Sequence, residues 1–131
     1  MIYALDTNTV SYGWRGAGRV ADKLRGMQPA ELALPSMVVH ELENGLKQSP
    51  ENSRRWQLFE ALIGHVRVLP FDLASSREAS RIKASLDTLG TPIGDFDLLI
   101  AATALAHGAT LVTHNKREFA RVLGLLVEDW F

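Results

Sequence analysis

Residues 1–10 read MIYALDTNTV: the apolar run that starts at Ile2 ends in Asp6, and three small polar residues follow at once. A strand that is almost wholly apolar is typical of a parallel sheet covered on both faces. Asp6 therefore stands at the carboxyl end of a strand that we expect to be buried. Two interpretations of Asp6 remain open at this point: it caps a helix that starts next, or it is a ligand held at the rim of the sheet.

Further along the 131 residues, short apolar runs alternate with longer stretches of helical period. We expect strands at residues 2–5, 31–34, 66–69, 110–113 and 125–127, and helices at 18–27, 36–48, 51–64, 73–89, 95–107 and 116–122. This alternation predicts βαβ units and a parallel sheet within one domain spanning residues 1–131. Ser36 suits a helix N-cap, and Gly108 suits a left-handed residue that ends the helix before it.

The bulk composition excludes several classes of protein. The chain is 47% hydrophobic, which is typical of a soluble globular protein, and it has no cysteine, which excludes disulfides, thiol chemistry and cysteine-bound zinc. No apolar stretch is long enough to span a bilayer and no signal peptide is visible, so we expect a cytoplasmic protein without a membrane partner.

The net charge of −1 gives no global indication of nucleic-acid binding. The basic residues are nevertheless grouped in three stretches: Arg15, Arg19, Lys23 and Arg25; Arg54 and Arg55; and Lys116, Arg117 and Arg121. Each group by itself is typical of a solvated helix face. Basic patches that offset an acidic pocket would give the same overall balance.

Polar residues follow a second expected strand as well. Thr113, His114 and Asn115 come after an apolar run, just as Asp6 does. Ligands of open α/β sheets bind at the carboxyl ends of the strands, so the two segments are expected to converge. The simpler interpretation of Asn115 is a turn residue. The four histidines show no spacing typical of zinc sites, and we expect each to be structural.

The helix expected at 36–48 carries two glutamates, Glu41 and Glu43, on opposite borders of its apolar stripe. Helical phase does not choose between them. Gly45 lies one turn after Glu41 on the same side, and glycine in a helix costs about 1 kcal/mol relative to alanine. The chain would accept that cost if another group has to approach the helix closely at Gly45. Because Glu41 lies on the same side as Gly45, this favours Glu41 as the functional acid. The alternative is that both glutamates are merely solvated.

Asp95 and Asp97 stand at the start of a strongly apolar helix. Both are compatible with an N-cap and a first-turn acid that interact favourably with the helix dipole. One cap needs only one aspartate, so we expect Asp95 to be the cap and Asp97 to be available for function. Asp97 adjoins the apolar residues Leu98 and Leu99, where a carboxylate is costly without compensation.

Three carboxylates and an amide at one edge of a sheet would repel one another and resist ionisation. A divalent cation relieves that repulsion. Because the candidate ligands are all oxygens, Mg²⁺ or Mn²⁺ is the expected ion. Such an ion can activate water and neutralise a leaving oxygen in phosphodiester chemistry.

The motifs LDTN, HELENG, IGDFDLLIAA and LVTHNKREF occur in this order, and together they resemble the PIN domain. The match is closest to the VapC-type toxins of bacterial toxin–antitoxin pairs and runs from Ile2 to about Trp130. The resemblance implies a three-layer α/β/α sandwich with a short, mostly parallel central sheet. It also implies a metal-dependent ribonuclease that uses Mg²⁺, with Mn²⁺ as a substitute.

The resemblance also implies roles for individual residues. Asp6, Glu41 and Asp97 match the family's acidic ligands, and Asn115 matches a fourth position where many relatives have aspartate, so one tightly held Mg²⁺ is expected. The resemblance gives supporting roles to Thr7 and Asn8, which would orient the first aspartate, to Thr113, which would line the site, and to Asp95, which would be a cap or an outer group.

The partners that the resemblance implies are an antitoxin, whose carboxyl-terminal segment enters the acidic groove, an RNA substrate and a second copy of the chain in a homodimer. The main alternative is a module that keeps the fold and binds RNA or protein without catalysis. A small-molecule phosphohydrolase is less favoured, because the DTNT run lacks a second aspartate and no Walker-type loop is present.

Overall fold

The computed structural model describes all residues from Met1 to Phe131 and contains one five-stranded sheet. The strands are β1 (Tyr3–Leu5), β2 (Leu32–Pro35), β3 (Arg67–Leu69), β4 (Thr110–Val112) and β5 (Val127–Glu128). Their order in the sheet is β3-β2-β1-β4-β5, and every neighbouring pair is parallel. The first strand of the sequence is therefore the central strand of the sheet.

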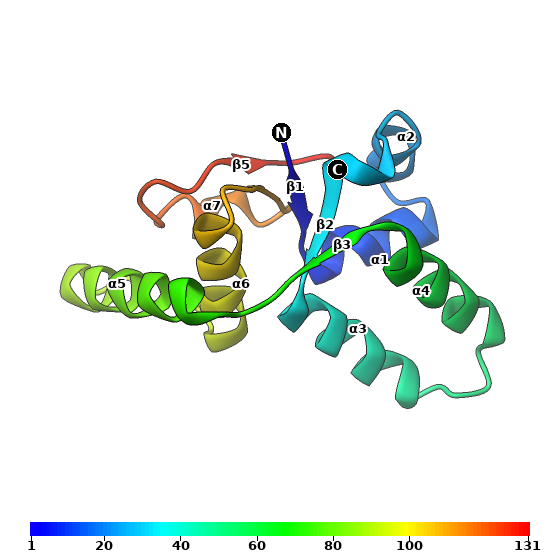
Figure 1. Ribbon diagram of the computed structural model, residues 1–131, viewed down its shortest axis with the longest axis horizontal. Coiled ribbons are helices and arrows are strands. Elements are labelled where there is room, and N and C mark those ends of the chain that lie inside the picture. The colour runs from blue at the N-terminus through cyan, green and yellow to red at the C-terminus, as the bar shows by residue number, and fades with distance from the viewer.

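Seven α-helices surround the sheet: α1 (Thr7–Arg15), α2 (Val20–Arg25), α3 (Ser36–Lys47), α4 (Ser53–His65), α5 (Leu73–Leu89), α6 (Asp95–Ala106) and α7 (Lys116–Phe119). A short 3₁₀ turn, Pro29–Glu31, precedes β2. In Figure 1, α5 and α6 lie on one side of the strands and α1, α2 and α4 on the other. This arrangement confirms the predicted α/β/α sandwich. None of the helices has the length and apolar character needed to cross a membrane.

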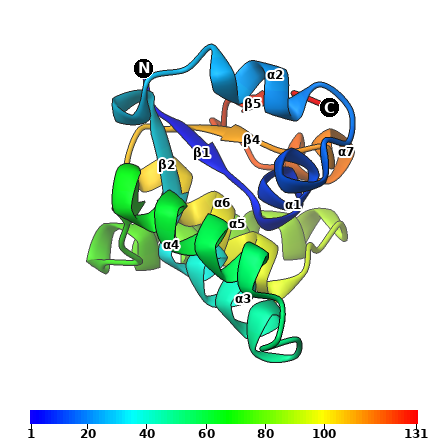
Figure 2. The same ribbon diagram turned by 90° about the vertical axis from the view of Figure 1, so that its right-hand side faces the viewer.

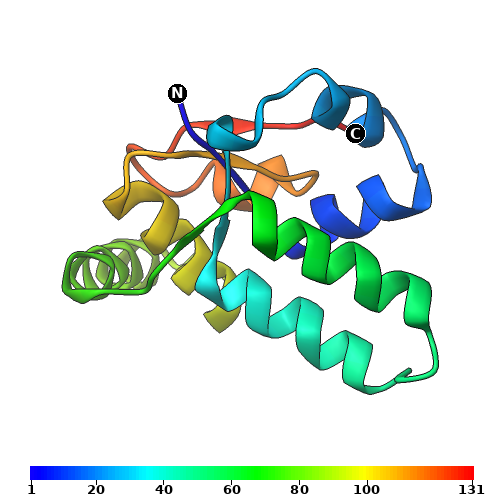
Figure 3. The ribbon, with the colours of Figure 1, turned by 45° about the vertical axis from the view of Figure 1, so that its right-hand side comes forward.

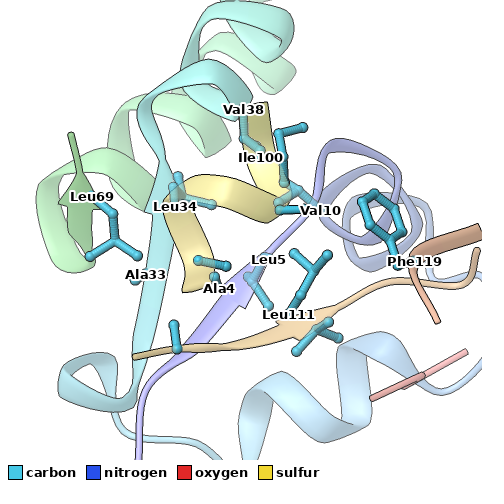
Figure 4. Close-up of a cluster of buried hydrophobic side chains, with 14 of the residues drawn as sticks. Ala4, Leu5, Val10, Ala33, Leu34, Val38, Leu69, Ile100, Leu111 and Phe119 are labelled. Atoms are coloured by element: carbon cyan, nitrogen blue, oxygen red, sulfur yellow. The ribbon is translucent and has the colours of Figure 1, made fainter. Parts of the chain in front are cut away.

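The core lies on both faces of the central strands. Ala4 of β1, Leu34 of β2 and Leu111 of β4 are fully buried. Figure 4 shows these side chains together with Val38 of α3 and Ile100 of α6. The burial explains why β1 and β4 read as continuous apolar runs rather than as alternating ones.

The structure corrects the expected elements at the amino-terminal end. Residues 7–15 form helix α1, which was missing from the expected helices although the capping interpretation of Asp6 implied it, and the helix expected at 18–27 is the shorter α2. Ser36 is not an N-cap, because Pro35 holds that position and the Ser36 hydroxyl accepts a hydrogen bond from Phe71 N. Gly108 does adopt the expected left-handed conformation, with φ of 67°.

Two features of the fold place functional side chains at one edge of the sheet. The carboxyl ends of β1 and β4 are neighbours, with Leu5 paired to Val112. Helices α3 and α4 form an antiparallel pair that extends beyond the carboxyl end of β2, as Figure 3 shows. The segments that follow β1, β2 and β4 therefore meet at this edge.

Candidate active site

Asp6 acts both as a cap and as a free acid, so the two interpretations of it are compatible. Its Oδ1 atom accepts a hydrogen bond of 2.8 Å from Thr9 N at the start of α1. Its own backbone N donates to Val112 O at 3.1 Å, which ties the residue to β4. The second carboxylate oxygen has no hydrogen-bond partner in the protein. Asp6 is therefore a buried, rigidly held carboxylate with one oxygen available.

Glu41, and not Glu43, faces the site from α3. The Thr7 hydroxyl donates a hydrogen bond of 2.6 Å to Glu41 Oε1, whereas the Glu43 side chain is exposed. Thr7 thus orients the glutamate rather than Asp6, which corrects the role expected for it. The expectation for Gly45 was also wrong, because no atom lies within 4 Å of the position that a Cβ would occupy there.

Asp97 is the third residue of α6, and its pKa is raised to about 6. Burial is the largest cause, and repulsion from the carboxylates of Glu118, Glu41 and Asp6 follows. Glu118, Glu41 and Asp6 come from three other segments and lie near enough to act on Asp97, and we call these four carboxylates the acid site. Asp95 is not the N-cap of α6, as we expected, because Gly94 holds that position; Asp95 is exposed.

Glu118 is a member of the acid site that the sequence analysis missed. It lies on α7, and its Oε2 atom accepts a hydrogen bond of 2.7 Å from Asn115 Nδ2. Asn115 in turn is fixed by its backbone N, which donates to the buried Thr113 hydroxyl at 3.0 Å. The signal available in the sequence was the spacing, since a residue three positions after Asn115 returns to the same side of a helical turn.

Two surface hollows adjoin the carboxylates of Asp6 and Asp97. One, of about 230 Å³, is lined by Asp6, Asn8, Tyr12, His114 and Asn115. The other, of about 470 Å³, is lined by Glu41, Gly94, Asp95, Phe96 and Asp97. The candidate site residues therefore line these hollows, apart from Thr113, which is buried beneath Asn115, and Thr7, which lines a third hollow of about 190 Å³ together with Glu41.

Comparison with known proteins shows to which family this chain belongs. The PIN domain profile matches residues 3–125. The chain is 31% identical over 128 residues to the tRNA(fMet)-specific endonuclease VapC of Shigella flexneri, with 98% of this chain and 97% of the relative covered. The chain belongs to the PIN-domain family, in its VapC branch.

Solved structures of VapC-containing complexes share the whole fold of this VapC-family chain. DNA-bound VapBC from Salmonella typhimurium matches with a TM-score of 0.89 and 29% identity over 100% of this chain and 99% of the other. VapBC2 from Rickettsia felis, bound to a DNA fragment from their promoter, matches with a TM-score of 0.88 and 28% identity over 100% of both chains.

The donor set of this VapC-family site fits a hard divalent cation that keeps part of its water shell. All the candidate ligands are carboxylate or amide oxygens. Burial and then repulsion from neighbouring carboxylates raise the pKa of Asp97, and a bound cation relieves that repulsion. No group of three or more acidic, histidine or cysteine side chains stands close enough to hold one ion directly. Direct ligation by Asp6 and Asp97 stays a prediction. Of the two ways in which Glu41 could ligate such an ion, directly or through water, ligation through water fits this geometry better.

Proposed function

We propose that this protein is the ribonuclease toxin of a toxin–antitoxin pair and that it hydrolyses RNA phosphodiester bonds with Mg²⁺ in the cytoplasm. As a member of the VapC ribonucleases it is a nuclease, and the likeness covers almost the entire chain. One observation carries the proposal for the mechanism: four carboxylates from separate segments gather at one sheet edge, where burial and then repulsion from the other three raise the pKa of Asp97 to about 6. A protein does not maintain such repulsion for stability.

In the proposed mechanism, Asp6 and Asp97 would hold Mg²⁺, and Glu41 and Glu118 would contribute to its binding through water. When bound, the ion lowers the pKa of water and neutralises charge on the phosphate and the leaving oxygen. The cap at Thr9 fixes Asp6, and the Thr7 hydroxyl fixes Glu41, so that both acids keep their positions during the reaction. Glu41 is then placed to orient the attacking water, and the expected products carry a 5′-phosphate and a 3′-hydroxyl.

Exposed basic side chains near the acid site are proposed to bind the RNA backbone. Lys116 and Arg117 begin α7, next to Asn115, and Arg15 ends α1. Each such contact with a phosphate adds to the affinity and makes binding sensitive to salt. Arg19, which follows α1, is the fourth candidate.

The partners proposed for this chain are an antitoxin and a second copy of itself. The relatives from Rickettsia felis and Salmonella typhimurium were solved as VapBC complexes, which supports a cognate antitoxin. A basic side chain from that antitoxin, placed in the acid site, would relieve the same repulsion as the metal ion and would therefore inhibit the enzyme. The homodimer is proposed from the family resemblance.

RNA cleavage tests the proposal. The purified protein is incubated with a tRNA(fMet) transcript, chosen from the name of the Shigella relative, and with total bacterial RNA, in the presence of Mg²⁺ or of EDTA. We expect cleavage only with Mg²⁺, and a loss of at least about 100-fold in Asp6→Asn, Asp97→Asn and Glu41→Gln. Glu43→Gln, the exposed neighbour on α3, is the matched control and should cleave like the wild type. Unchanged cleavage by Asp6→Asn and Asp97→Asn would overturn the mechanism.

The alternative, a binding module without catalysis, rests on the asparagine at position 115 where an acid was expected. Glu118 weakens that argument because it supplies a fourth carboxylate beside Asn115. A thermal shift with Mn²⁺ separates the two functions. Stabilisation that disappears in Asp97→Asn supports the nuclease, whereas no stabilisation supports the binding module.

A further inference from the structure

Three aromatic rings form a second cluster directly beside the acid site. The His114 ring stacks on the Phe131 ring, with centroids 4.2 Å apart and planes inclined by 23°. The Tyr12 ring, from α1, meets both of them edge-on, with centroids 5.9 Å from His114 and 4.9 Å from Phe131. We call Tyr12, His114 and Phe131 the ring cluster.

The ring cluster is held rigidly by the backbone around it. His114 Nδ1 lies 2.9 Å from Asp129 Oδ2, and Asp129 Oδ1 accepts a hydrogen bond of 2.8 Å from Phe131 N. Phe131 O accepts a further bond of 2.9 Å from Arg19 N. Figures 1 and 2 show this carboxyl-terminal segment passing close to α2. A ligand that binds these rings would therefore not have to order them first.

The accessible part of the ring cluster faces the hollow beside Asp6. His114 keeps 46% of its side chain exposed, although Phe131 covers one face of the ring. Its Nε2 atom makes no hydrogen bond within the protein. Tyr12 and His114 line the hollow of about 230 Å³ together with Asp6, Asn8 and Asn115. The hollow thus combines the aromatic rings of Tyr12 and His114 with two side-chain amides and a carboxylate of the acid site.

We propose that this hollow binds the nucleobase next to the scissile phosphate, stacked on His114, with Asn8 and Asn115 bonding to the edge of the base. Stacking on aromatic rings and hydrogen bonding to base edges are how proteins read splayed-out RNA bases. A base within a duplex cannot enter such a hollow, so the substrate is an unpaired nucleotide, in a loop or a bulge. This inference rests on the proposed ribonuclease activity and adds the site that selects the nucleotide.

The test combines changes in the protein with changes in the RNA. A cut made by the wild-type protein is mapped in the tRNA(fMet) transcript or in total RNA, and a synthetic RNA spanning the cut is prepared. Two further forms lack the base at the nucleotide before or after the cut. Single-turnover rates are measured for the wild type, His114→Ala, His114→Phe and His65→Ala. His65, an exposed histidine at the end of α4, is the matched control.

Removal of one flanking base is expected to slow the wild type by about 10- to 100-fold, which is the range of one stacked base. His114→Ala should lose a similar factor on intact RNA and nothing further on the RNA without that base. His114→Phe should regain most of the rate on intact RNA, and His65→Ala should behave as the wild type on all three.

Two other results would overturn the inference. If His114→Ala slows the intact and the base-free RNAs by the same factor, the ring cluster only supports the fold. If neither missing base affects the wild type, the hollow holds no base. A wild-type protein that cuts no RNA would instead overturn the proposed activity, and this inference with it.

Discussion

At the scale of single residues, Asp97 is the carboxylate whose ionisation the acid site disfavours. Its pKa rises from an ordinary value of 3.8 to about 6 because burial and three neighbouring carboxylates disfavour its charge. An acid whose pKa is raised by folding destabilises the folded state wherever it is ionised. The metal-free protein should therefore lose stability as the pH rises from about 4 to about 6.

Asp97→Asn is accordingly expected to raise the stability of the metal-free protein at pH 7 by on the order of 1–3 kcal/mol. The gain should vanish near pH 4, where the wild-type carboxyl is protonated as well. Urea unfolding in EDTA at the two pH values measures this difference. The matched control is Asp95→Asn, the exposed carboxylate two residues earlier, which should change little. Equal stability of Asp97→Asn and the wild type at pH 7 would show that folding does not raise the pKa of Asp97.

Thr7 is the residue that positions Glu41. Thr7→Val keeps the shape of the side chain and removes the hydroxyl that donates to Glu41 Oε1. We expect a stability loss of about 1 kcal/mol and a several-fold decrease in the cleavage rate, because Glu41 is no longer held. Thr7→Ser should restore both, which is measured by urea unfolding and by the RNA assay. Full activity in Thr7→Val would mean that Glu41 needs no support.

At the scale of elements, the stability of α1 and the proposed RNA cleavage depend on the same side chain, that of Asp6. Asp6→Ala removes the N-cap and should cost about 1 kcal/mol of stability, whereas Asp6→Asn keeps a good cap. Both substitutions should abolish cleavage, so the two variants separate stability from activity.

Asp72 offers the matched control for this pair. It caps α5 in the same way, because its Oδ1 atom accepts a hydrogen bond of 3.0 Å from Ser75 N. Asp72 lies near His107 at the carboxyl end of α6, however, whereas Asp97 lies at the amino end of that helix. Asp72→Ala should lose a similar amount of stability and remain active. Cleavage by Asp6→Asn at the wild-type rate would restrict Asp6 to its capping role.

Helix α1 is an element that could not be placed from the pattern of apolar residues in the sequence. Thr7, Asn8 and Thr9 are weak helix formers, and the helix exists because Asp6 caps it and Gly16 ends it with a φ of 68°. Its tertiary anchor, the bond from the Thr9 hydroxyl to Val112 O, joins residues far apart in the sequence. Strands β1, β2 and β4 were predictable because burial on both faces leaves an apolar run. A cap and a long-range bond leave no such pattern.

The same limit applies to the site. Asp6, Glu41 and Asp97 could be proposed because each stands at the end or start of an expected element. The only signal for Glu118 was its spacing of three residues from Asn115. That spacing does not show that the turn formed by Thr113 and Asn115 brings α7 and its glutamate toward Asp97.

At the scale of the whole molecule, the carboxyl-terminal segment is fastened to the connection between α1 and α2. Gly18 has a φ of 61°, and a Cβ there would stand 2.6 Å from Phe131 O. Gly18→Ala should therefore destabilise the protein by more than about 1 kcal/mol. Gly64→Ala, inside α4 with nothing within 4 Å, is the control and should be neutral or stabilising. Urea unfolding compares the two, and equal stability would show that the segment is not anchored at Gly18.

The central claim is that the acids at the carboxyl ends of β1 and β4 and at the start of α6 serve one metal ion. The most direct measurement is anomalous X-ray diffraction from crystals soaked in Mn²⁺. Our account predicts one strong manganese peak between the carboxylates of Asp6 and Asp97, with Glu41 and Glu118 around it. A peak elsewhere on the surface, or no peak at saturating Mn²⁺, would contradict it.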